Sequence, residues 1–126
     1  MTESSDPKAQ GSYLQSGINK SSMNREQVVI TSVEIRPPVV TFADMNTEMK
    51  EFAFERAEYA YKMVFKQDWK YYKDAAQFLK DQFDEKFGGT WHVIVGRHFG
   101  SFVSYESKCI ILFWINQIGF LIYKFG

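Results

Sequence analysis

Apolar residues are scattered at the start of the chain and become regularly spaced only further along it. Residues 1–27 contain six serines and charges of both signs, with few apolar side chains between them. A segment of this kind buries too little apolar surface to offset the entropy lost on ordering. Residues 1–27 are therefore expected to form a flexible N-terminal extension.

The pattern changes at Val28, where β-branched residues take over. The stretch "VVITSVEI" begins there and runs to Ile35. We expect residues 28–36 to form either an extra edge strand or an arm that docks on a partner, and the sequence does not separate the two. Pro37 and Pro38 exclude a central strand at that point, and "VVTF" resumes as a short strand over residues 39–42.

Apolar positions at spacings of three and four predict two consecutive helices. Asn46 is the expected N-cap of the first helix, with Glu48 in its first turn. Asp68 is the expected cap of the second helix, and Gly88-Gly89 its end. The apolar stripes consist of Met49, Ala53, Ala57, Ala60 and Val64 in the first helix, and Tyr72, Ala76, Leu79, Phe83 and Phe87 in the second.

After Gly89 the periodicity is that of β-strands. Trp91, Val93 and Val95 fall on one face of a strand, and residues 99–105 alternate around Gly100 and Ser101. The stretch "CIILFWI" over residues 109–115 is apolar on both faces, as in a central strand covered on both sides. The expected fold is α+β, with a two-helix hairpin packed on an antiparallel sheet of four to five strands. Since two helices cover one face, a second copy of the chain is expected to cover the other.

Composition narrows the class of protein. The 126 residues carry 15 basic and 15 acidic side chains, so no net field draws the chain toward nucleic acid or an anionic membrane. Cys109 is the one cysteine, which excludes an internal disulfide and a cysteine-rich zinc site and favours a reducing compartment. With no long apolar run and no secretory leader, the expectation is a soluble intracellular protein.

Candidate chemistry gathers in "GTWHVIVGRHFGSFVSYESK", residues 89–108, which hold both histidines and three serines. No suitably spaced acid completes a nucleophile and base, so no catalytic residues are predicted. His92, His98 and Cys109 lack the spacing of a zinc site, and no phosphate-binding glycine loop is present. No metal or cofactor is therefore expected.

The same stretch suits a peptide-binding edge. Gly100 permits close approach of a foreign backbone, and Arg97 is placed to hold an acidic flanking residue. Ser101 and Ser104 offer hydroxyls beside strand amides that suit a ligand's threonine, with ordinary solvation of a strand as the less favoured alternative.

The stretch "TWHVIVGRHFGSFVSYESK", together with "ADMNTEM" and "KDAAQFLKDQFDEKF", resembles the small hub-type dynein light chains. The resemblance covers residues 37–126, which are expected to form the light chain domain, and needs no gap from Lys73 onward. It implies a dimer in which the strand of residues 99–105 crosses to the partner's sheet. Each of two grooves would then bind an extended peptide as an added strand.

The resemblance also implies which residues form these surfaces. The implied groove consists of Lys73, Arg97, His98, Phe99, Gly100, Ser101, Phe102, Val103, Ser104, Tyr105, Ile110, Leu112 and Trp114. The implied dimer interface consists of His92, Phe99, Ser101, Val103 and Tyr105. In the family the position of His92 lies between subunits, and protonation there separates them. We expect acid-promoted dissociation of this chain too, because charging an imidazole buried between subunits opposes association.

Several residues depart from the family pattern. Phe102 and Leu112 stand where tyrosines are usual, and Tyr105 stands for a histidine that holds the ligand's glutamine. Trp114 replaces another tyrosine, Ser104 a threonine, His98 an asparagine and Phe125 a serine. An insertion also lies between the helices, within "MVFKQDWKYY". A ligand more apolar than the usual Thr-Gln-Thr motif is therefore expected.

Such divergence is typical of specialised family members in axonemal outer dynein arms. The expected partners are dynein intermediate chains and other dynein light chains, either a second copy or a paralogue. The expected location is the cytoplasm and cytoskeleton, including the cilium axoneme. A general dimerisation hub, or a regulator that binds linear motifs of proteins outside dynein, is the alternative.

Overall fold

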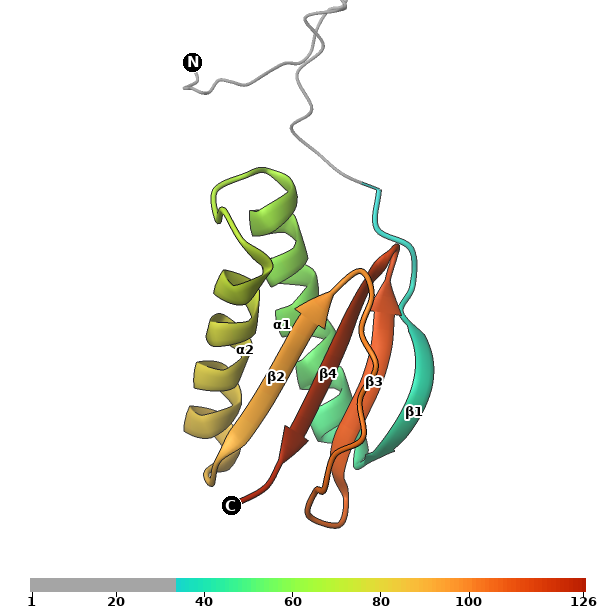
Figure 1. The fold of residues 1–126 in the computed structure, drawn as a ribbon, viewed down its shortest axis with the longest axis vertical. Helices are drawn as coiled ribbons and strands as arrows, with labels where there is room; N and C mark the ends of the chain where they lie inside the picture. Colours follow the sequence, from blue (N-terminus) through green and yellow to red (C-terminus); the bar gives the residue numbers. More distant parts are fainter. Residues whose placement is uncertain (1–33) are drawn as a thin grey trace, which may run out of the picture. The chain divides into compact units, whose positions relative to one another are not determined.

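The structure is a computed structural model that describes residues 34–126 (Figure 1). The expected flexible extension and residues 28–33 of the expected strand or arm lie outside the described residues. The elements in chain order are β1 (Val39–Met45), α1 (Thr47–Phe65), α2 (Tyr72–Phe87), β2 (Trp91–Gly96), β3 (Cys109–Ile115) and β4 (Ile118–Lys124).

The four strands form one antiparallel sheet in the order β1-β3-β4-β2. Both helices pack on the same face of this sheet (Figure 1). The predicted α+β class, with a helix hairpin on an antiparallel sheet, is confirmed. The first strand runs to Met45, beyond the predicted end at Phe42.

The predicted cap of α1 is correct. The side chain of Asn46 accepts a hydrogen bond of 2.8 Å from the backbone N–H of Met49. Ala53, Ala57 and Ala60 are fully buried, so this stripe of small residues lets α1 approach its neighbours closely.

The predicted cap of α2 is wrong. The N-cap is Tyr71, whose N–H donates to the Asp74 carboxylate at 3.0 Å. The N–H groups of Asp68 and Trp69 both donate to Met63 O, so these residues close the end of α1 instead. In α2 the buried alanine is Ala75 and not the expected Ala76. The helix ends at Phe87, and its C-cap is Gly88, whose φ of 73° suits glycine.

The core between helices and sheet is strongly aromatic. Trp91, Phe83, Phe113 and Phe120 are its largest fully buried side chains. The Trp91 indole donates to Gly88 O at 2.9 Å, which satisfies its polar group inside the core.

A carboxylate fixes β2 to α2. Asp84 Oδ1 accepts from Trp91 N–H at 2.8 Å, and Lys80 Nζ donates both to Asp84 Oδ2 at 2.9 Å and to Trp91 O at 2.8 Å. Burial raises the pKa of Asp84, but the hydrogen bonds from Lys80 and Trp91 and the positive charge of Lys80 outweigh it, so the pKa is lowered overall. This carboxylate therefore stabilises the position of the edge strand in its ionised form.

Candidate functional site

The face of the sheet that points away from the helices carries the residues singled out by sequence. Alternation along the strands and the observed register place three rows of side chains on this open face. The rows are Val39, Trp114, Gly119 and Gly96; then Phe42, Leu112, Leu121 and Ile94; then Asp44, Ile110, Tyr123 and His92. Most of this surface is apolar, and its groove-floor residues Ile110, Leu112 and Trp114 come from β3.

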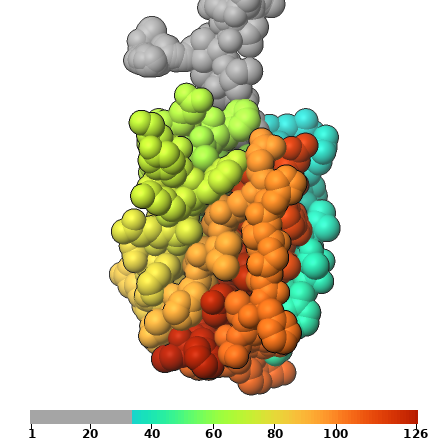
Figure 2. Space-filling model, in the orientation of Figure 1, coloured from blue at the N-terminus to red at the C-terminus, as the bar shows by residue number. Residues whose placement is uncertain are grey.

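A segment between β2 and β3, residues 97–108, crosses the open face. In Figure 2 it is the orange band that runs down the front of the molecule. It forms no strand in the described chain, although its alternation predicts one over residues 99–105. The chain's own segment thus lies where we expected a second copy, and it provides part of the cover that the apolar face requires.

The segment is held mainly at its two ends. Arg97 donates from Nε to Tyr72 OH at 3.3 Å and from Nη1 to Gln117 Oε1 at 3.4 Å. At the other end Glu106 N–H donates to Lys124 O at 2.8 Å. Between these anchors the contacts are aromatic: Phe99 stacks on Trp114 at 6.0 Å, and Tyr105 meets Phe42 edge-on at 6.3 Å.

Two glycines make room for the Trp114 and Phe99 rings. Gly119 lies directly opposite Trp114 in the ladder, and Gly96 lies opposite Gly119 on its other side. A Cβ at Gly119 would lie 2.8 Å from two Trp114 ring carbons and 3.1 Å from Phe99. The indole N–H of Trp114 donates to Thr41 Oγ1 at 3.1 Å, which fixes the ring across the glycines.

The remaining predicted groove residues are exposed on the segment or near its ends. Phe102 projects fully into solvent, and Val103 is half-buried. Lys73 lies on the first turn of α2 with its ammonium 5.5 Å from the centre of the Tyr71 ring. Like Phe102, the predicted residues His98, Gly100, Ser101 and Ser104 are exposed.

His92 faces the edge of the open surface. Its Nε2 lies 2.9 Å from Phe125 O, and its ring stacks on Tyr123 at 5.1 Å. The carbonyl can only accept, so Nε2 carries the proton in this arrangement. In its row of the open face, Tyr123 lies between His92 and the groove-floor residue Ile110.

Sequence reasoning missed the contribution of β1. Thr41 and Phe42 lie on the open face beside Leu112 and Trp114, because β1 pairs with β3. The sequence predicts a strand at residues 39–42, but it does not predict which strand of the sheet lies beside it. No local signal in the chain specifies that neighbour.

Both edges of the sheet are open in the described chain. β2 pairs only with β4, and β1 pairs only with β3. An edge strand presents a row of unpaired N–H and C=O groups, which is a template for adding another strand. Residues 34–126 therefore hold two strand-addition edges and one strand-like segment without a strand partner.

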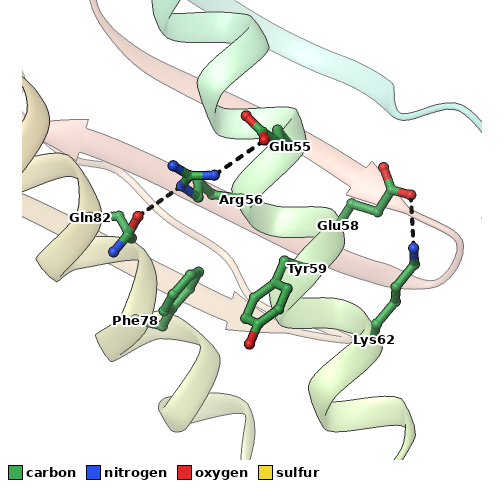
Figure 3. Close-up of a pocket in the computed structure, with 7 residues that line it drawn as sticks. All are labelled: Glu55, Arg56, Glu58, Tyr59, Lys62, Phe78 and Gln82. Atoms are coloured by element: carbon green, nitrogen blue, oxygen red, sulfur yellow. Dashed lines mark hydrogen bonds and ion pairs between the residues drawn. The ribbon is translucent and has the colours of Figure 1, made fainter.

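The outer side of the helix hairpin has a hollow of about 500 Å³ between α1 and α2 (Figure 3). Tyr59 and Phe78 lie between the helices there, and the charged groups pair with one another. Arg56 contacts Gln82 at 2.8 Å and Glu55 at 3.3 Å, and Lys62 contacts Glu58 at 3.5 Å. With its charges paired internally, this hollow offers no reactive group.

Within residues 34–126, no cluster of three or more His, Cys, Asp or Glu side chains is placed to hold a metal ion. Across that same described range, neither helix is both long and apolar enough to cross a membrane.

Comparison with known proteins decides the family. The family model for dynein light chain type 1 matches residues 37–125. The chain belongs to the dynein light chain type 1 family. A curated relative, "Dynein light chain 1, cytoplasmic" of Debaryomyces hansenii, is 39% identical over 89 residues, which are 71% of this light chain and 92% of the relative.

Solved structures show the same fold. The dynein light chain-like domain of a calcium-binding protein from Fasciola hepatica matches with a TM-score of 0.58 at 21% identity, covering 75% of this chain and 95% of that one. The DLC-like domain of CsTAL3 matches with a TM-score of 0.53 at 19% identity, covering 69% and 90%. The resemblance seen in the sequence is confirmed, and the family is a non-catalytic one, as predicted.

Proposed function

We propose that this light chain dimerises by exchanging residues 99–105, so that the segment of each copy pairs with β2 of the other. The observation that carries the proposal is the coexistence in one chain of an open β2 edge and a strand-like segment that has no strand partner. Reciprocal exchange satisfies both sets of backbone groups at once. The anchors at Arg97 and Glu106 leave only ring contacts to break between them.

The exchanged sheets would frame two grooves, each binding a linear segment of a dynein intermediate chain by strand addition. The groove would be framed by the segment and floored by Ile110, Leu112 and Trp114, with Phe42 beside them. Trp114 already uses its N–H on Thr41, so this floor offers a ligand few free polar groups. The ligand is therefore an extended segment with apolar side chains at alternate positions, and a Thr-Gln-Thr peptide should bind weakly in a titration.

The family and the altered groove support the proposed cellular role. We place the light chain in a dynein motor of the cytoplasm and cytoskeleton, specifically in the outer arm of the axoneme, where it supports assembly with intermediate chains and sister light chains. The second candidate is a general dimerisation hub or regulator that binds short linear motifs of proteins outside dynein. The similarity to a relative named as cytoplasmic supports a location outside the axoneme, which such a hub would share.

Gentle affinity purification of the tagged full chain from its own cells, followed by mass spectrometry, tests the role. Outer-arm heavy and intermediate chains are the expected companions. The matched variants are Leu112→Lys, which places a charge on the groove floor, and Gln77→Lys, which places the same charge on an exposed helix position. Leu112→Lys should lose intermediate chains and Gln77→Lys should retain them. Unrelated proteins without any dynein chain would replace this role with the hub.

A further inference from the structure

The exchange described above uses β2 and leaves the other edge of the sheet open. β1 exposes apolar side chains along that edge, with Val39 at 66% and Phe42 at 46% of their full accessible area. Natural edge strands are usually protected by charges, prolines or a cover. In β1 only Asp44 is charged, and its carboxylate accepts a hydrogen bond from Lys108 N–H at 3.1 Å.

The chain itself carries a strand of matching character directly before this edge. The stretch "VVITSVE", residues 28–34, is rich in β-branched residues and precedes β1 by only a few positions. Its length is close to that of β1, which has 7 residues. Besides residues 99–105, it is the segment outside the sheet whose composition suits edge pairing.

This segment cannot easily fold back on the β1 that follows it. Arg36 and Pro37 each precede a proline, which favours extended backbone at both positions, and proline fixes its own φ near the extended range. Residues 34–38 contain no turn and no positive φ. Ile35 packs against the core and Arg36 N–H donates to Asn116 Oδ1 at 3.2 Å, which ties the connection to the β3–β4 turn (Figure 1).

We propose that residues 28–34 of one copy add as an antiparallel strand to β1 of a second copy, and that the second copy reciprocates. Two extended chains related by a two-fold axis at Pro37 place Thr31 opposite Ala43 and Ser32 opposite Phe42. The prolines then face each other at the axis, so backbone hydrogen bonds are expected on either side of the axis and not at it. The register shift of β1 between Val40 and Phe42 bends the strand, so pairing is expected first along Phe42–Met45.

This contact is separate from the β2 exchange, so the two contacts together would link dimers into larger even-numbered assemblies.

The test uses the full chain with Thr31→Pro/Ser32→Pro. Neighbouring residues in a strand point their N–H groups to opposite sides, so one of the two prolines removes a needed donor in either register. The matched control is Ser21→Pro/Ser22→Pro, the same change outside the proposed strand. Sedimentation is measured over a range of concentrations.

The expected result is at least a twofold fall in assembly mass for Thr31→Pro/Ser32→Pro and none for the control. If the β2 exchange holds, the fall is from tetramer or larger to dimer; if the exchange fails, it is from dimer to monomer. Equal masses for the parent and both variants would overturn the proposal.

A disulfide test fixes the register and the copy. In a Cys109→Ser background, Thr31→Cys/Ala43→Cys should give a covalent dimer on oxidation, whereas Ser21→Cys/Ala43→Cys should not. A disulfide closed within one chain, visible as an unchanged mass on a non-reducing gel with both thiols lost, would contradict exchange between copies.

Discussion

Gly119→Ala tests whether the glycine floor under Trp114 organises the open face. The new Cβ would lie 2.8 Å from two carbons of the Trp114 ring, a separation that real Cβ contacts essentially never show. The neighbour is a ring fixed by a hydrogen bond to Thr41 and a stack on Phe99, so it cannot move without losing both. The substitution should therefore destabilise the sheet on the side of the predicted groove.

The expected cost follows from those contacts. A neutral hydrogen bond contributes about 0.5–1.5 kcal/mol, and an aromatic pair contributes about 0.5–1.5 kcal/mol. Overpacking alone costs about 1–3 kcal/mol where the surroundings yield only in part. The indole can either stay in place and be overpacked, or rotate and lose its hydrogen bond and its stack. Only one of these two costs applies, so we expect the free energy of unfolding to fall by about 1–3 kcal/mol.

Urea unfolding at a fixed protomer concentration measures this loss, since association would otherwise change the apparent stability. Gly100→Ala is the matched control, because no atom lies within 4 Å of the place that the new Cβ would take and the φ of Gly100 is not positive. That control should change the free energy of unfolding by no more than about 0.5 kcal/mol. In a Trp114→Phe background the cost of Gly119→Ala should shrink. An undiminished cost there, or equal costs for the two glycine variants, would refute the reasoning.

A further prediction concerns the carboxylate that joins β2 to α2. Asp84→Asn should lower the free energy of unfolding at neutral pH by about 1–2 kcal/mol, because it weakens charge-assisted hydrogen bonds. The pKa of Asp84 is lowered in the folded chain, so its contribution to stability is present above the unfolded pKa and is lost as pH falls through the folded pKa. Urea unfolding of the parent and the variant should therefore give converging stabilities in acid, whereas the exposed control Asp81→Asn should show no such trend.

Local signals in the sequence predict most of the fold. The Asn46 cap, the alanine stripe and the glycine at the end of α2 act within a few residues, so spacing alone predicts them. The start of α2 was missed because Asp68, a good capping residue, hydrogen-bonds through its N–H to the end of α1. A capping residue in the loop between two helices can hydrogen-bond to the end of either helix. The loop conformation decides which one, and composition does not specify that conformation.

The residues of the site that lie on a single strand could be predicted from the sequence. Those that come together only through the pairing of distant strands could not. Ile110, Leu112 and Trp114 alternate along one strand, so their common face follows from periodicity. Thr41 and Phe42 join them only because β1 crosses over to pair with β3, which is a long-range choice made by the whole sheet.

The exposed side chain of Phe102 bears on both the segment of residues 97–108 and the open β2 edge. A phenylalanine fully in solvent leaves a large apolar area exposed to water, and its segment neighbours are held only by rings and end anchors. A segment selected to stay on its own sheet would bury that ring or carry a polar residue there. An exposed phenylalanine at this position, beside an open β2 edge, is the arrangement expected of a strand whose packing partner lies in a second molecule. By the same reasoning the apolar edge of β1, which has no strand partner within residues 34–126, is the edge on which we propose that the β-branched residues of a second copy pair.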